Sequence, residues 1–143
     1  MRYEEMRTAF ELLLGARLLE ARRSQWHVRL LLERPGRSAL GCPALWYLTG
    51  ALVNCADLVY RPAAGERLLA PERLAELEPR LEAVGGADPT LELACTDRDG
   101  GPGALSLRAR GLLLYDAAGE ELTLDGLRTT ARECWGRGTE DDG

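Results

Sequence analysis

The side chains best suited to covalent chemistry are four cysteines and a single histidine, His27. Catalysis by a thiol needs an exposed thiolate beside an imidazole, and the N-terminus of a helix lowers a thiol pKa. Cys42 is the best thiol for such a pair, because Pro43 directly after it is typical of the first position of a helix. The alternative, which we favour, makes Cys42 a cap-position residue and His27 a polar residue on a sheet face. We therefore predict no catalytic residue.

The other cysteines, Cys55, Cys95 and Cys134, are far apart in the sequence, and no CxxC pair is present. Structural zinc sites usually take two of their ligands from one short turn, so this spacing does not predict one. Cys55 and Cys95 lie within apolar patterns, and we expect them to be small buried residues. The sequence thus predicts neither a metal site nor a cofactor.

Further residue patterns exclude other chemistries. All 18 basic residues apart from the histidine are arginines, so lysine Schiff-base and Walker-type chemistry is excluded. No GxSxG or HExxH motif is present. The residues Asp97–Gly100 resemble the start of a calcium loop, but Arg108 occupies the twelfth position, where a carboxylate should bind. This segment is predicted to be a hairpin turn.

One group of residues is a candidate binding surface. Arginine and tryptophan are enriched where proteins bind each other, and they also stack on nucleic-acid bases. Such residues gather where the first expected helix meets the first expected strand, and two more arginines lie on a later strand. If these strands are neighbours, the residues join into one basic surface. The predicted protein-binding residues are Arg22, Arg23, Trp26, His27, Arg29, Arg108 and Arg110. The alternative is ordinary pairing of these arginines with glutamates on a solvated sheet.

Hydrophobic periodicity indicates the elements that position these residues. Apolar side chains at spacings of three and four predict a helix over residues 3–22. Alternation predicts a strand over 26–32, followed by a turn and a short strand over 38–41. Pro43 begins a second expected helix, with helical spacing of apolar residues as far as Val59. Val53 and Val59 in its second half are also compatible with a strand, so a strand is an alternative there.

The C-terminal half is typical of an antiparallel meander that follows a helix and precedes another. Pro71 begins the first of these helices, which is interrupted at Pro79 and reaches Val84. We expect strands over 90–96, 104–109, 111–115 and 121–124, a helix over 125–135, and a disordered acidic tail over 136–143.

These elements predict a single compact α+β domain over residues 1–135. The expected architecture is an antiparallel sheet of four to five strands, packed by an N-terminal helix, a central helical pair and a C-terminal helix. A chain of 143 residues with 45% apolar composition can bury one core.

Composition also indicates the compartment and the partners. No apolar run reaches the length of a membrane span, and the acidic start is not typical of a secretory signal. We therefore expect a cytoplasmic protein with reduced thiols and no membrane partner. The net charge of −5 disfavours nucleic acid as a partner, although a local arginine cluster keeps it as an alternative.

The leading functional hypothesis is a non-catalytic protein that binds another protein, as an adaptor, a regulator or an inhibitor of the immunity type. A homodimer is left open. The alternative hypothesis is a domain that binds a small molecule or a nucleotide, with weak enzymatic activity that depends on Cys42 and His27. Its pocket would lie between the sheet and the helix expected after Pro43, with Arg29 as a third polar group.

Overall fold

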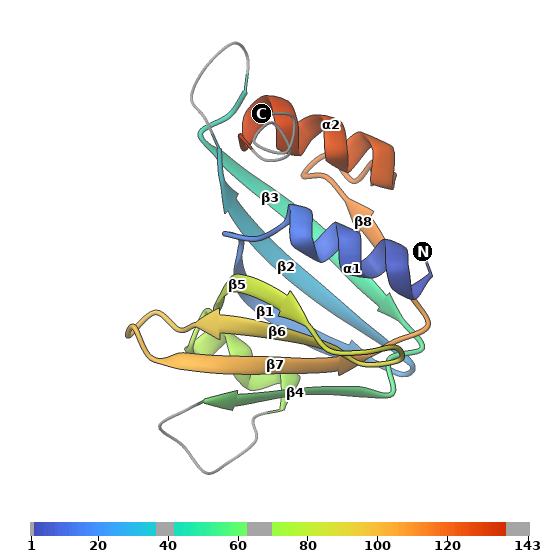
Figure 1. The fold of residues 1–143 in the computed structure, drawn as a ribbon, viewed down its shortest axis with the longest axis vertical. Helices are drawn as coiled ribbons and strands as arrows, with labels where there is room; N and C mark the ends of the chain where they lie inside the picture. The colour runs from blue at the N-terminus through green and yellow to red at the C-terminus, as the bar shows by residue number, and fades with distance from the viewer. Residues whose placement is uncertain (1, 37–41, 63–69, 137–143) are drawn as a thin grey trace.

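The structure is a computed structural model that describes residues 2–36, 42–62 and 70–136. Helices α1 (Tyr3–Leu12) and α2 (Leu124–Cys134) and the short 3-10 helix η1 (Pro71–Glu76) accompany one large sheet (Figure 1). The strands are β1 (Arg17–Ser24), β2 (His27–Pro35), β3 (Leu45–Val53), β4 (Asp57–Pro62), β5 (Arg80–Gly85), β6 (Leu91–Thr96), β7 (Pro102–Arg108), β8 (Gly111–Tyr115) and β9 (Glu121–Leu122).

The sheet is antiparallel throughout, with the strand order β4-β7-β6-β5-β1-β2-β3-β8-β9. Its two halves meet where β1 pairs with β5 through only one residue pair, Arg17 with Arg80. Beyond that pair η1 packs against β1, and the backbone N–H of Arg23 donates to Oε2 of Glu72 at 3.1 Å. Helix η1 also contacts β4. It therefore joins β1 and β4, the two outermost strands of the half of the sheet that runs β4-β7-β6-β5-β1.

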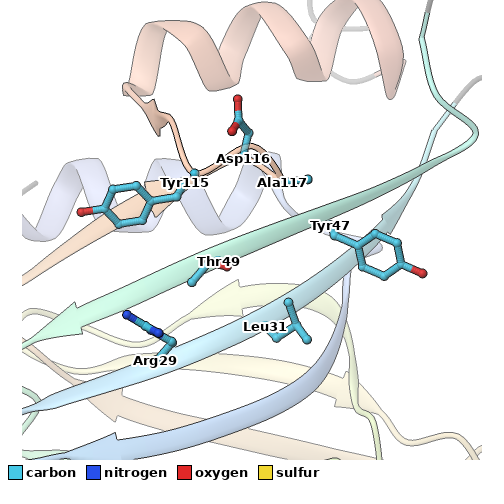
Figure 2. A pocket seen from close by; sticks show the side chains of 8 residues that line it. Arg29, Leu31, Tyr47, Thr49, Tyr115, Asp116 and Ala117 are labelled. Carbon is cyan, nitrogen blue, oxygen red and sulfur yellow. The ribbon is translucent and has the colours of Figure 1, made fainter.

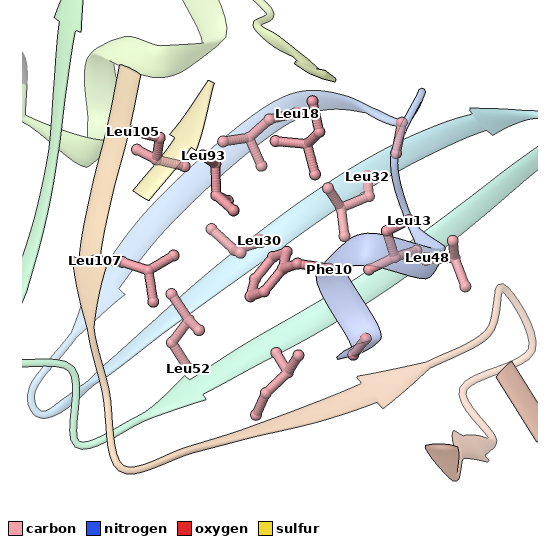
Figure 3. Packing of buried hydrophobic residues seen from close by; sticks show 14 of the residues in the cluster. Phe10, Leu13, Leu18, Leu30, Leu32, Leu48, Leu52, Leu93, Leu105 and Leu107 are labelled. Atoms are coloured by element: carbon pink, nitrogen blue, oxygen red, sulfur yellow. The ribbon is translucent and has the colours of Figure 1, made fainter. Parts of the chain in front are cut away.

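One face of the sheet holds the hydrophobic core. Alternate residues along each strand point to that inner face, and leucine dominates it. Helix α1 lies across this face and inserts Phe10 and Leu13 between Leu30, Leu48 and Leu52 (Figure 3). Each fully buried leucine stabilises the fold by roughly 2 kcal/mol relative to an exposed one. The packing of α1 therefore fixes which face of β2 and β3 remains exposed.

A disulfide and a pair of indole rings attach α2 to the start of β3. Cys42 and Cys134 form the disulfide, which joins positions 92 residues apart. The rings of Trp46 and Trp135 meet edge to face with centroids 5.8 Å apart, and the Arg34 guanidinium lies 5.2 Å from the Trp135 ring centroid. The N-terminus of α2 is capped by Thr123, whose hydroxyl accepts from the backbone N–H of Gly126.

The predicted α+β fold with four to five strands and a central helical pair is wrong. The described residues form a mostly antiparallel sheet of nine strands with small helices. The helix expected over 3–22 ends at Leu12, and Gly15 then adopts φ of +95°, which a right-handed helix does not allow. Residues from Arg17 onward form β1 instead.

The helix expected from Pro43 is also wrong, because this segment forms β3 and β4. Leu48 and Leu52 lie four residues apart, a spacing that fits one face of a helix and one face of a strand equally well. Tyr47 before Leu48, and Thr49 and Ala51 between the two leucines, point outward, and this alternation belongs to a strand. The strand left open for the second half of the segment is therefore correct.

The helix expected over 71–84 is also replaced by two elements. Its first part forms the 3-10 helix η1, and its second part forms the strand β5. The predictions of strands over 26–32, 90–96, 104–109 and 111–115 and of a helix over 125–135 are confirmed within a few residues. The predicted strand over 38–41 lies outside the described residues, as do residues 137–143 of the predicted tail.

Candidate functional site

The face of the sheet opposite the core is exposed over β1, β2, β3 and β8, and we call it the outer face. It consists of the residues that alternate with the buried leucines of these four strands. These residues are Glu20, Arg22, His27, Arg29, Leu31, Glu33, Leu45, Tyr47, Thr49, Ala51, Val53, Leu113 and Tyr115. Because β1, β2, β3 and β8 are consecutive neighbours, the side chains form one continuous surface.

The β3 and β8 part of this surface is apolar. Leu45, Tyr47 and Leu113 are 40%, 43% and 37% exposed, and they account for three of the four large hydrophobic side chains found exposed in the described part of the chain. Ala51 pairs directly with Leu113 across the two strands, so the apolar side chains are contiguous. We call Leu45, Tyr47, Ala51, Val53, Leu113 and Tyr115 the apolar row.

The β1 and β2 part carries the cations. Arg22 and Arg29 lie directly opposite each other on the two strands, which places like charges side by side. Arg22 forms an ion pair with Glu20 at 3.0 Å. Within the ranges that the structure describes, the Arg29 side chain has no ion-pair or hydrogen-bond partner. Arg29 is therefore available to an anionic group of another molecule.

His27 lies beside these two arginines at the turn between β1 and β2. Its Nδ1 accepts a hydrogen bond from the backbone N–H of Asn54 at 3.4 Å. An accepting Nδ1 leaves the proton of the neutral ring on Nε2, so the ring can donate outward. We call the two charged residues Arg22 and Arg29, together with the neutral hydrogen-bond donor His27 beside them, the cationic group.

Shallow hollows connect the cationic group with the apolar row. One hollow of about 440 Å³ lies between Arg29, Thr49, Tyr47 and Tyr115 (Figure 2). A second of about 380 Å³ lies between Arg22, His27, Arg29 and Leu113. Arg29 lines both, and it also lines a third hollow beside Glu20. The guanidinium of Arg29 thus lies at the centre of the surface.

Three other predicted residues lie on a separate surface at the end of the β1–β2 hairpin. Arg23, Trp26 and Arg110 line a hollow of about 360 Å³, and Trp26 is 69% exposed. The backbone here is well fixed, because Arg23 Nη1 donates to the Cys55 carbonyl at 3.1 Å and the Cys55 N–H donates to the Trp26 carbonyl at 2.7 Å. Six of the seven predicted residues are therefore divided equally between the outer face and this hairpin end.

Arg108 belongs to neither surface. It ends β7, and its guanidinium forms an ion pair with Asp57 of β4 at 3.1 Å. Strand β7 pairs with β4 and β6, so it does not adjoin β1 or β2. The sequence could not indicate this separation, because strand order in a sheet is not encoded locally.

The thiol–imidazole pair considered for catalysis does not form. Cys42 is oxidised in a disulfide with Cys134, and it precedes a strand rather than a helix. His27 begins β2, whereas Cys42 lies beyond the other end of the β2–β3 hairpin, eight residue pairs away. At about 3.3 Å per residue this separation is roughly 25 Å.

The two free thiols behave as predicted. Cys55 and Cys95 are both free and buried. Burial raises the pKa of the Cys95 thiol to about 12, and burial also raises the pKa of Cys55, against the opposing effect of the nearby Arg23 guanidinium. Neither thiol is a reactive nucleophile near neutral pH.

The segment after β6 is the hairpin turn that the sequence predicts. Asp97 Oδ1 accepts the backbone N–H groups of Asp99 and Gly101, so this carboxylate stabilises the turn itself. Over the described ranges, no group of three or more potential metal ligands occurs. None of the helices in these ranges is long and apolar enough to cross a membrane.

The apolar row is the part of this surface that the sequence analysis did not predict. The sequence pattern placed Leu45 and Tyr47 in a helix. It placed Leu113 in the middle of a strand, without indicating which face of the sheet it lies on. The signal that could have found Leu45 and Tyr47 is the alternation across residues 45–53, whereas no local signal indicates the face on which Leu113 lies.

The chain matches no protein-family model, no curated protein sequence and no solved structure. The function is therefore inferred from the residues of the outer face.

Proposed function

We propose that this chain is a protein-binding module whose docking surface is the outer face of β1, β2, β3 and β8. The observation that supports the proposal best is the position of Arg29, which has no acidic partner among the described residues and shares one hollow with exposed Tyr47 and another with exposed Leu113. Exposed apolar side chains next to an arginine are typical of protein interfaces, where aromatic residues and arginine supply much of the binding energy.

The energetics favour a partner that supplies a carboxylate to Arg29. A guanidinium can form two parallel hydrogen bonds with a carboxylate, and such pairs are stronger when an interface excludes water. Arg22 next to it raises the local positive potential, although Glu20 offsets part of that charge. Burial of the apolar row against the partner would supply the nonspecific part of the binding energy.

Capture of a partner by point variants of the full chain tests this proposal. Tagged wild-type chain, Arg29→Ala and Leu113→Glu are incubated with lysate of the source organism, and the eluates are analysed by native mass spectrometry. Matched controls are Arg98→Ala, an exposed arginine in the turn after β6, and Ala94→Glu, an exposed position on β6.

The expected result is one stoichiometric protein bound to the wild type and to both controls, with at least about tenfold less bound to the two outer-face variants. Equal capture by all five chains would contradict the proposal, as would a protein that only the control variants lose. Thermal unfolding of each variant shows whether a loss of binding comes from a loss of folded protein.

One observation favours a second candidate function, the binding of a small molecule. The hollow between Arg29, Thr49, Tyr47 and Tyr115, of about 440 Å³, is within the usual size range of ligand sites. In this alternative, native mass spectrometry would find the chain with a small added mass and no protein partner. The part of this hypothesis that used Cys42 as a nucleophile is not proposed, because that thiol is oxidised.

The expected cytoplasmic location is still a prediction. The Cys42–Cys134 disulfide is an observation against it, because disulfides persist mainly in oxidising compartments. Alkylation of the protein as it is isolated from its source, followed by mass measurement, tests the expectation of reduced thiols.

A further inference from the structure

We propose that the partner docks on the outer face with one amphipathic α-helix, which lies along β2 and β3 and carries carboxylates on the flank that faces Arg29. This inference rests on the proposed function and specifies the chemistry of the binding partner. It is carried by the arrangement of the cationic group and the apolar row on neighbouring strands.

The width of the surface favours a helix over an extended segment. Arg29 lies on β2 and Leu113 on β8, with β3 between them, so the two side chains start about 10 Å apart. An extended segment directs only alternate side chains toward the sheet, in a single line, and cannot cover both features. A helix is about 10 Å wide and carries parallel stripes of side chains, so it can contact both.

The length of the surface gives the length of the helix. The apolar row runs along β3 from Tyr47 to Val53, a rise of about 20 Å at 3.3 Å per residue. A helix of about 13 residues has this length, because each residue adds 1.5 Å. Apolar side chains at spacings of three and four would face the row, and Leu45 extends it at one end.

The charges on the face indicate where the partner's carboxylates lie. Arg22, His27 and Arg29 are near the β1–β2 turn, whereas Glu33 lies toward the opposite end of β2, beside Arg17 and Tyr47. Glu20 is already paired with Arg22. Acidic residues at the β1–β2 turn end of the docked helix are therefore attracted, while acidic residues near Glu33 are repelled. On a chain of net charge −5, this local cationic group fixes the position of an acidic partner.

A peptide selection on the full chain tests this inference without a known partner. Random 16-residue peptides displayed on phage are selected on the immobilised wild-type chain and counter-selected on Arg29→Glu. The enriched sequences are read, and the most frequent one is synthesised for affinity measurements with the wild type, Arg29→Ala and Arg98→Ala. A second version of the same peptide carries proline at its centre.

We expect enriched sequences with apolar residues at helical spacing and two or more acidic residues toward one end. The synthesised peptide should bind Arg29→Ala at least about tenfold more weakly than wild type or Arg98→Ala. The version of the peptide with proline at its centre should not bind, because proline breaks a helix.

Three other outcomes separate failure of this inference from failure of the proposed function. Enriched peptides that depend on Arg29 but are basic, or alternate like strands, would overturn the acidic helix and leave the protein-binding function standing. Absence of any peptide that depends on Arg29 would overturn both. Tighter binding of a 20-nucleotide single-stranded DNA than of any peptide, with a steep loss at high salt, would also overturn both.

Discussion

Tyr60 is the residue whose environment has the clearest physical consequences. Its ring is fully buried in β4 and passes beneath Gly103 of β7, where a Cβ atom would overlap the tyrosine hydroxyl. That hydroxyl has no hydrogen-bond partner among the residues that the structure describes. A buried polar group without a partner costs free energy, because it gives up its hydrogen bonds to water.

The change Tyr60→Phe should therefore stabilise the fold. We expect the free energy of unfolding, measured by urea denaturation at neutral pH, to rise by about 1 kcal/mol, since the substitution removes only the unpaired hydroxyl. The control is Tyr115→Phe, which changes a partly exposed hydroxyl on the outer face and should alter stability little. A loss of more than about 1 kcal/mol for Tyr60→Phe would mean that the hydroxyl makes a stabilising interaction.

The same burial predicts how stability depends on alkaline pH. Burial raises the pKa of Tyr60 from 10.0 to about 12 and that of Cys95 from 9.0 to about 12. The folded chain therefore keeps these protons to a higher pH than the unfolded chain. The stability they provide is fully present below pH 9 and is lost as the pH rises toward 12, at up to about 1.4 kcal/mol per pH unit for each group.

Urea unfolding at pH 8, 10 and 11 measures this slope. Tyr60→Phe should flatten it between pH 10 and 11, while the Tyr115→Phe control should not. An unchanged slope in Tyr60→Phe would show that other groups cause the alkaline loss.

At the scale of elements, the disulfide between the start of β3 and the end of α2 is the main constraint from outside the sheet. A crosslink over 92 residues removes much of the freedom of the unfolded chain, and such crosslinks typically contribute about 2–4 kcal/mol. We expect the double change Cys42→Ser and Cys134→Ser to lower the free energy of unfolding by that amount. It should also change tryptophan fluorescence, because Trp46 and Trp135 pack beside the bridge.

Reduction gives the control for this prediction. Dithiothreitol should destabilise the wild type as much as the double substitution does, and it should leave the substituted chain unaffected. If wild-type stability is the same with and without the reductant, the disulfide does not contribute to it.

The helices and strands differ in how well the sequence alone predicts them. Strands β2, β6 and β7 alternate between apolar and polar residues, β8 is a short apolar run between turn residues, and α2 has a well-placed cap. The local pattern was therefore sufficient to predict that these elements exist. For β3, leucines four residues apart satisfied both a helix and a strand, and only pairing with β2 and β8 decides between the two.

The candidate site, too, could be predicted only where the local sequence pattern was sufficient. Local alternation placed His27 and Arg29 on one face of an expected strand, whereas Arg22 was grouped with them from the end of an expected helix that is in fact part of β1. Tyr47 was not added because its segment was assigned to a helix despite the alternation across residues 45–53. Leu113 could not be added, because it joins the face only through the non-local pairing of β8 with β3. Arg108 was grouped with them wrongly for the same reason, since the order of strands is a long-range property.

At the scale of the whole molecule, the charge distribution predicts how binding responds to salt. The chain has a net charge of −5, but its cationic group is concentrated on the outer face. Attraction between exposed charges is screened over about 8 Å at physiological ionic strength. We therefore expect the association rate of the partner to fall several-fold between 50 and 500 mM salt, while the dissociation rate changes less, because buried apolar contacts resist screening.

Surface plasmon resonance with the captured partner measures the two rates separately. In Arg29→Ala the salt dependence of association should be weaker than in wild type. An association rate that is independent of salt in the wild type would contradict a role for the cationic group.

Docking of another protein on the outer face is tested most directly by photocrosslinking from a residue within that face. Tyr47 is replaced by a photoreactive benzophenone amino acid in the full chain, and Ala94, exposed on the other half of the sheet, is replaced in a second chain as the control. Both chains are irradiated in lysate of the source organism. We predict one dominant crosslinked protein from position 47 and none from position 94. Crosslinks of equal strength from both positions, or only from position 94, would contradict the account.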